Sequence, residues 1–188
     1  MKIILGSNSP RRKELLGYIL SDFEVEVKSI SEDYPADMNV KEIAAFLAEK
    51  KAKAFHDEKY KDCVVITADT TVALDNKLLE KPANKKEAKE MLLQISDRKH
   101  LVISAACLMV NHEMDVFSEI TEVYFKKLTE REIDFYIDKY QPFDKAGAYG
   151  IQEWIGMIGI EKIIGSYYNV VGLPIQLLYK KLLNMGIV

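Results

Sequence analysis

The sequence of 188 residues has few cysteines, no long apolar run and no excess of positive charge. Its two cysteines, Cys63 and Cys107, lie far apart in apolar stretches and form no C-x-x-C pair, so we expect buried thiols in a reducing compartment. The apolar segment at residues 3–5 is too short for a signal peptide, and no apolar run approaches the length of a membrane span. We therefore expect a cytoplasmic protein with no membrane partner.

Other absences exclude further classes of protein. The three histidines have no metal-ligand spacing, which argues against a histidine metal site. The net charge of −3 gives no basic footprint for a nucleic acid polymer and suits a small anionic ligand in a cleft better. The sequence contains no G-x-x-x-x-G-K-[ST] motif, which disfavours a kinase or nucleotidyltransferase built on a P-loop.

The chain shows no linker, repeat or low-complexity tract, and its length predicts one domain over residues 1–188, or one domain with a deep cleft between two lobes. Strand-like and helix-like segments alternate, which predicts an α/β fold. Two long strand-like runs separated by three polar residues predict a hairpin, so we expect a mixed sheet. The predicted strands cover residues 2–5, 63–67, 70–74, 77–79, 101–110 and 114–125.

Helix starts are marked by capping residues. Ser9 followed by Pro10 predicts a helix over residues 10–20. A cap residue three positions before a glutamate predicts three more helices, over about 40–56 from Asn39, 85–95 from Asn84 and 130–140 from Thr129. Pro174 predicts the start of a last helix.

The turn at residues 6–12, Gly-Ser-Asn-Ser-Pro-Arg-Arg, joins the first strand to the first helix. Backbone N–H groups at a helix start favour an anion, and Arg11 and Arg12 add donors that match phosphate oxygens. This pattern predicts a phosphorylated ligand. The alternative is an ordinary helix start with two solvated arginines.

Asp69 and Lys51 are two charged residues that the sequence pattern places beside apolar segments. Asp69 follows the buried run at residues 64–68, so we expect it at the end of a strand, where it would bind Mg²⁺ or act as a general base. The alternative is a carboxylate that caps a turn or pairs with a structural arginine. Lys51 falls near the centre of the inner stripe of its helix and needs a partner, such as a bound phosphate, unless it reaches out to water.

Three further features have weaker signals. Pro82 favours an extended backbone at Lys81, which would point its ammonium into a groove. The glycines on either side of Tyr149 indicate a sharply turning loop, and Gln152 at its end offers a donor and an acceptor for a base edge. Residues 165–174 form another loop that enters a helix. Each is also compatible with a plain turn.

Together, five blocks in order make the chain resemble the Maf family of nucleotide pyrophosphatases over nearly its whole length. The blocks are Ser7-Asn8-Ser9-Pro10-Arg11-Arg12, Ala68-Asp69-Thr70, Lys81-Pro82, residues 144–152, and Gly165-Ser166-Tyr167 with Asn169-Val170-Val171-Gly172-Leu173-Pro174. The resemblance implies a mixed α/β fold with two lobes around a cleft, related to the house-cleaning pyrophosphatases that remove inosine triphosphate. It also implies hydrolysis of a nucleoside triphosphate to the monophosphate and pyrophosphate with a divalent cation, Mg²⁺, Mn²⁺ or Co²⁺.

The resemblance implies roles for individual residues. Asp69 matches the catalytic residue of the family, and we add Glu32 as a second possible ligand of the cation beside it. The phosphate-binding positions of the family match Ser7, Arg11, Arg12, Lys51 and Lys81. Arg11, Thr70 and Gln152 match the branch acting on dTTP and UTP, whereas the branch acting on 7-methyl-GTP differs at the first and third of these positions.

Two residues depart from the family pattern. Thr67 replaces a frequent glycine, and we expect little effect. Glu80 replaces the usual glycine before Lys81 and would weaken phosphate attraction or bind metal. The resemblance also leaves open a modified pyrimidine nucleotide as the substrate, a homodimer, and the alternative that the protein regulates cell division and septum formation by binding a nucleotide with little turnover.

Overall fold

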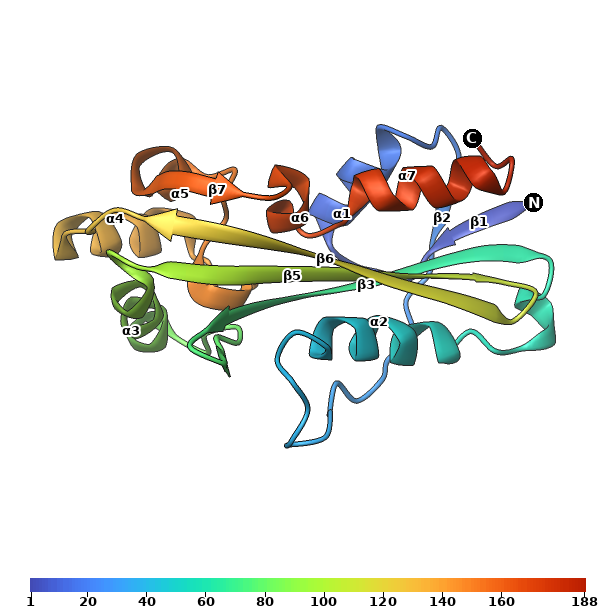
Figure 1. Cartoon of the computed structure of the whole chain (residues 1–188), viewed down its shortest axis with the longest axis horizontal. Coiled ribbons are helices and arrows are strands. Elements are labelled where there is room, and N and C mark those ends of the chain that lie inside the picture. The colour runs from blue at the N-terminus through green and yellow to red at the C-terminus, as the bar shows by residue number, and fades with distance from the viewer. The chain divides into compact units, whose positions relative to one another are not determined.

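The computed structural model describes all 188 residues, and the chain divides into two compact units. Unit 1 comprises Met1–Thr70, Ser104–Glu119 and Gly172–Val188, and unit 2 comprises Thr71–Ile103 and Ile120–Val171. Figure 1 follows the chain through its elements from the N-terminus to the C-terminus.

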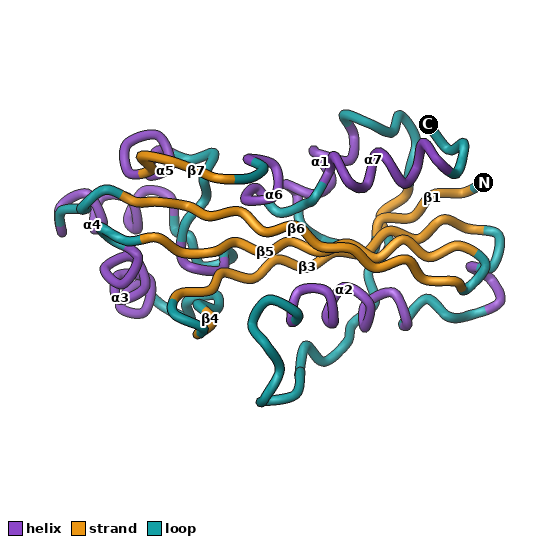
Figure 2. The backbone as a smooth tube through the Cα atoms, in the orientation of Figure 1, coloured by secondary structure: helices purple, strands orange, loops and turns teal.

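A mixed sheet of seven strands carries the fold, with the order β2-β1-β3-β5-β6-β7 and with β4 paired to β3 (Figure 2). Strand β1 is parallel to β2 and to β3, whereas β4 is antiparallel to β3 and β7 is antiparallel to β6. The predicted mixed α/β class is therefore confirmed. The strands are β1 Lys2–Leu5, β2 Glu24–Val25, β3 Cys63–Leu74, β4 Lys77–Leu78, β5 Lys99–Val110, β6 Glu113–Phe125 and β7 Ile160–Ile164.

Seven α-helices accompany the sheet, and three of the predicted caps are present. Ser9, Asn84 and Thr129 each accept a hydrogen bond from the backbone N–H three residues later, and Thr129 and Glu132 form a complete capping box. The helices are α1 Pro10–Gly17, α2 Ile43–Lys53, α3 Lys85–Ile95, α4 Glu130–Tyr140, α5 Trp154–Gly159, α6 Tyr167–Val171 and α7 Ile175–Asn184, with short 3₁₀ turns at Glu58–Tyr60 and Ala146–Ala148.

Three predicted helix boundaries are wrong. Helix α2 begins at Ile43 rather than near residue 40, because the Asn39 side chain accepts from the N–H of Lys41 in a local turn and caps no helix. It also ends at Lys53 rather than near residue 56. Helix α1 ends at Gly17 instead of residue 20. The short elements β2, α5, α6 and β7 were not predicted.

The predicted hairpin between the two long strands is confirmed, and a second tight turn joins β3 to the antiparallel strand β4. Asp75 and Asn76 have φ values of 49° and 61°, and Asn111 and His112 have 50° and 66°. Paired left-handed residues match the twist of the strands that they connect.

Each unit has its own buried cluster. In unit 1, Ile4, Phe55, Tyr60, Val65 and Met109 pack together. In unit 2, side chains of α3, α4 and α5 pack against β3, β5 and β6 residues; the most buried include Leu92, Ile95, Ile133, Tyr136 and Ile155. Cys63 and Cys107 are buried free thiols, as predicted. None of the helices has both the length and the apolar character needed to cross a membrane.

Candidate active site

Asp69 lies on β3 just beyond the stretch that pairs with β1. The last pair joins Leu5 to Ile66, and the N–H of Gly6 then donates to the Ile66 carbonyl at 2.8 Å. From there the chain leaves the sheet through the turn that carries Ser7. Strand β1 therefore no longer pairs with β3 at Asp69, although the carboxylate remains largely buried.

The expectation that Asp69 stands at the end of a strand is wrong. Strand β3 continues unbroken to Leu74 because the β-branched residues Thr70, Thr71 and Val72 extend it. The position is instead set by where the neighbouring strand β1 ends.

Lys51 connects the two carboxylates that were candidates for the reaction. Its Nζ lies 2.6 Å from Asp69 Oδ1 and 2.7 Å from Glu32 Oε1. The side chains of Lys51 and Asp69 are 17% and 12% exposed, whereas Glu32 is 53% exposed. The prediction that Lys51 points inward toward a partner is confirmed, and this partner is a pair of carboxylates from distant parts of the sequence.

Thr67 fixes the helix of Lys51 to the strand of Asp69. Its hydroxyl is buried and donates to the Ala48 carbonyl of α2 at 2.6 Å, one turn before Lys51. Its methyl group lies 2.8 Å from where a Cβ at Gly6 would stand, so position 6 accepts only glycine while Thr67 stays there. The expectation that Thr67 matters little is at odds with these contacts.

Arg12 of α1 holds the backbone around Asp69. Its Nε donates to the Gly172 carbonyl at 2.9 Å, Nη1 to the Ala68 carbonyl at 2.9 Å and to Ser7 Oγ at 3.3 Å, and Nη2 to Thr70 Oγ1 at 3.0 Å. Four of the five guanidinium N–H groups are thus used within the protein. Arg12, which was predicted to bind phosphate, here holds together the chain segments on either side of Asp69. We call this set of hydrogen bonds the Arg12 clamp.

The Thr70 hydroxyl is likewise occupied by protein groups. Besides accepting from Arg12, it lies 2.8 Å from Ser104 Oγ and donates to the Gly172 carbonyl at 3.2 Å. Gly172 has a φ of 132°, a conformation that residues with a side chain rarely adopt. Thr70, the candidate specificity residue, is therefore hydrogen-bonded to Arg12 and to the Gly172 carbonyl.

The electrostatics of the cluster are close to balanced. Burial lowers the pKa of Arg12, the charge of Asp69 opposes that shift, and the neighbouring Arg11 adds to it. Arginine nevertheless stays protonated in proteins. The cluster thus contains three cations, Arg11, Arg12 and Lys51, and the two carboxylates of Asp69 and Glu32. A bound polyphosphate would add negative charge that these cations can neutralise.

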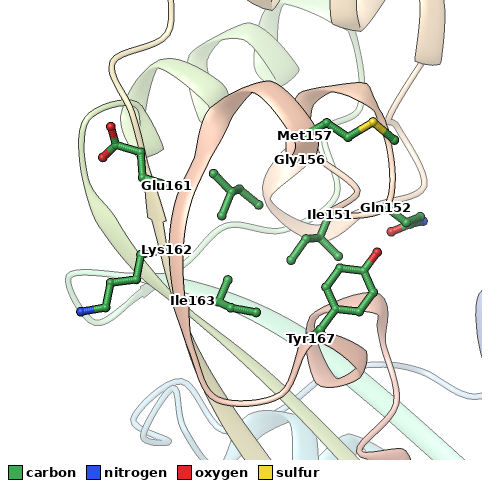
Figure 3. Close-up of a pocket in the computed structure, with 9 residues that line it drawn as sticks. Ile151, Gln152, Gly156, Met157, Glu161, Lys162, Ile163 and Tyr167 are labelled. Atoms are coloured by element: carbon green, nitrogen blue, oxygen red, sulfur yellow. The ribbon is translucent and has the colours of Figure 1, made fainter.

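The remaining predicted residues belong to unit 2. Lys81 is exposed and follows Glu80, whose carbonyl accepts from the N–H of Gly147 at 3.2 Å. Gln152 lines a cavity of about 380 Å³ with Ile151, Met157 and Tyr167, and Figure 3 shows Gln152 and the ring of Tyr167 on the same side of it.

The roles of two residues that hold these groups were not predicted from the sequence. Ser104 sits inside a long apolar strand and gives no signal in the sequence. Gly172 falls within the loop at 165–174 that was singled out, but its role as an acceptor for Arg12 depends on a contact 160 residues away in the chain. Such contacts follow from the tertiary fold alone.

Comparison with known proteins agrees with the fold and identifies the family. A family model described as "Maf-like protein" matches residues 2–185. The chain belongs to the Maf family. It is 50% identical over 182 residues to a "dTTP/UTP pyrophosphatase" of Parabacteroides distasonis and 48% identical over 182 residues to the protein of that name from Phocaeicola vulgatus, with 96% of this chain and 94% of the relative covered in both cases.

A solved structure supports the fold of this Maf protein. The Ham1 protein of Staphylococcus aureus aligns with a TM-score of 0.54, 18% identity, 98% of this chain and 100% of that chain. At this level of identity the likeness concerns the fold.

Proposed function

We propose that this Maf protein hydrolyses dTTP and UTP, or modified pyrimidine nucleotides, to the monophosphate and pyrophosphate. Relatives at 48–50% identity over almost the whole chain have the name dTTP/UTP pyrophosphatase. The observation that carries the proposal is the Lys51 ammonium between Asp69 and Glu32, beside the Arg12 clamp. This cluster combines a candidate general base with cations suited to a polyphosphate.

In the proposed reaction, Asp69 accepts a proton from a water molecule that attacks the α-phosphorus. The bond between that phosphorus and the oxygen bridging to the β-phosphate breaks, and pyrophosphate leaves with the bond's electron pair. Lys51 and Arg11 neutralise charge on the departing phosphates, since such reactions depend mainly on positioning and electrostatic stabilisation. Arg12 keeps Ser7, Ala68 and Thr70 in place around the base.

The carboxylates also suit a divalent cation. Asp69 and Glu32 face one ammonium, and Mg²⁺ is commonly held by one or two carboxylates together with phosphate oxygens and water. Asp69 and Glu32 would hold Mg²⁺, Mn²⁺ or Co²⁺, which supplies further charge stabilisation at the phosphates when bound.

The roles of Lys81 and Gln152 rest on their positions in the family motifs. Lys81 binds phosphate in this proposal, and Gln152 reads the base through its amide. Arg11 and Thr70 complete the set of specificity positions. The partner of this site is a small nucleotide rather than a nucleic acid polymer or a membrane. The buried free thiols suit the cytoplasm. A homodimer is a further expectation from the family.

The test is to incubate the purified chain with each canonical nucleoside triphosphate and with modified pyrimidine triphosphates in the presence of Mg²⁺, Mn²⁺ or Co²⁺. The expected products are monophosphate and pyrophosphate in equal amounts, with dTTP and UTP cleaved fastest. Release of inorganic phosphate instead would place the attack at the γ-phosphorus and contradict the proposal. Tight binding without any product would favour a nucleotide-responsive regulator.

A further inference from the structure

The loop that carries Gln152 is held by a hydrogen-bonded network from helix α4. Tyr136 is fully buried, and its hydroxyl accepts from the backbone N–H of Gly150 at 3.0 Å while it donates to the carboxylate of Glu153. One hydroxyl thus contacts the chain two residues before Gln152 and one residue after it.

A largely buried ion pair between Lys145 and Glu153 completes the network. Lys145 Nζ lies 3.1 Å from Glu153 Oε1 and 2.8 Å from Asp144 Oδ1, and the side chains of Lys145 and Glu153 are only 10% and 19% exposed. Gly150 packs directly on this pair, because a Cβ there would lie 3.0 Å from Glu153 Oε2 and 3.1 Å from Lys145 Cε. Removing one member of a sheltered pair leaves the other charge poorly compensated.

The start of the same loop is hydrogen-bonded to the two residues between β4 and Lys81. The N–H of Gly147 donates to the carbonyls of Leu79 and Glu80 at 3.0 and 3.2 Å. Gly147 has a φ of 70°, and a Cβ there would lie 3.0 Å from Val72 Cγ1, so glycine is required. The loop therefore has little freedom at either end.

The Gln152 side chain itself has no such restraint, and it lines the cavity together with Tyr167 and Met157. An amide distinguishes one base edge from another only while its donor and acceptor keep a fixed orientation. The restrained backbone on each side of Gln152 fixes the point from which its side chain extends, and so limits the orientations that the amide can adopt.

We propose that Tyr136 and Glu153 are positioning residues for Gln152, so that their hydrogen bond and the Glu153–Lys145 pair determine how well the protein distinguishes pyrimidine from purine nucleotides. This inference rests on the proposed function. The two residues act through the loop backbone and do not touch the nucleotide.

The first variant is Tyr136→Phe, which keeps the buried ring and removes only the hydroxyl. The Gly150 N–H then loses its acceptor, and an unpaired buried donor costs enough to change a binding ratio by about tenfold. The expected result is a fall of about tenfold in the ratio of kcat/KM for dTTP over GTP, produced mainly by a higher KM for dTTP with kcat nearly unchanged. Amide hydrogen exchange should quicken in residues 144–153.

The matched control is Tyr140→Phe. Tyr140 stacks on Tyr136 in the same helix with ring centroids 5.2 Å apart, so the same chemical change is made one turn away. It should leave the dTTP to GTP ratio and the exchange of the loop unchanged.

The second pair of variants is Glu153→Gln and Glu153→Ala. Glutamine keeps an acceptor for Tyr136 but removes the charge opposite Lys145, whereas alanine removes both. The ratio should therefore decrease in the order wild type, Glu153→Gln, Glu153→Ala. Partial rescue by glutamine separates positioning from a general loss of stability.

Four outcomes distinguish the hypotheses. A pyrimidine preference that survives in Tyr136→Phe, or a loop whose exchange does not change, would overturn this inference and leave the proposed function standing. An equal loss of kcat for every nucleotide would also overturn it, because that result indicates structural damage. Failure of the unsubstituted chain to release pyrophosphate would overturn the proposed function, and the inference with it.

Discussion

Asp69 and Lys51 compensate each other at 2.6 Å, so a change at either one alters the charge that the other faces. The sequence identified both residues, Lys51 from its place on a helical stripe and Asp69 from the end of an apolar run. Glu32 was expected beside Asp69, but the contact of Lys51 with both carboxylates was not predicted, because no spacing in the sequence relates residues 32, 51 and 69. Pairing of this kind is fixed by tertiary packing.

Asp69→Asn tests the proposed base directly. The amide occupies the same volume but does not take a proton from water, so turnover of dTTP should fall by about 10²-fold or more. Circular dichroism and urea unfolding should show a folded protein. Turnover within a few-fold of the unsubstituted chain would rule out Asp69 as the base.

Thr67→Val tests the link between α2 and β3. The change removes the hydrogen bond to the Ala48 carbonyl and should lower the free energy of unfolding by about 1 kcal/mol. Because Lys51 lies one turn beyond Ala48, dTTP turnover should also fall several-fold. Urea unfolding and steady-state kinetics measure the two effects.

Thr71→Val on the same strand is the matched control. Thr71 is also buried, but its hydroxyl has no hydrogen-bond partner, so replacing it with a methyl group should be neutral or stabilising. Equal destabilisation by the two variants would mean that the hydrogen bond of Thr67 has no special importance.

At the scale of elements, a cap residue predicted the start of a helix correctly where its side chain accepts a hydrogen bond from the first helical turn. Asn84 and Thr129 do so, whereas Asn39 has the same spacing to a glutamate and forms a separate turn. Segments such as β2, with two residues, and α6, with five, are too short for a periodic pattern, so no signal in the sequence predicts them.

Thr129→Ala should show the strength of the capping box. Loss of the hydroxyl that accepts from the Glu132 N–H should reduce the free energy of unfolding by about 1 kcal/mol. Asn39→Ala is the comparison, and its effect should stay within about 0.5 kcal/mol because residue 39 caps no helix. A larger loss in Asn39→Ala than in Thr129→Ala, measured by urea unfolding, would contradict the assignment of both caps.

At the scale of the whole molecule, the mixed α/β class could be predicted from the alternation of segments and from the long hairpin. The division into units made of separate chain segments could not, because it depends on how strands β3, β5 and β6 contribute to both. The network around Tyr136 was also missed, since a tyrosine on a helical stripe indicates only a core residue.

The stability of the molecule should depend on pH through His100. Burial lowers the pKa of His100 to about 4, and its Nε2 lies 2.7 Å from the Tyr149 hydroxyl. The unfolded chain binds a proton at this residue below pH 6.5, and the folded chain does so only below about 4. The free energy of unfolding should therefore decrease as the pH falls through this range, by about 3 kcal/mol in total.

Urea unfolding at pH 7, 5.5 and 4.5 measures this dependence. The glutamine of His100→Gln does not titrate. The free energy of unfolding of this variant should therefore decrease less over the same pH range, by the contribution of the His100 imidazole. Identical pH profiles for the two proteins would show that His100 is not the source.

The polypeptide passes between the two units after residues 70, 103, 119 and 171. One consequence concerns the engineering of the fold. No single cleavage or truncation point separates one unit from the other, so neither unit can be produced as one continuous stretch of this sequence.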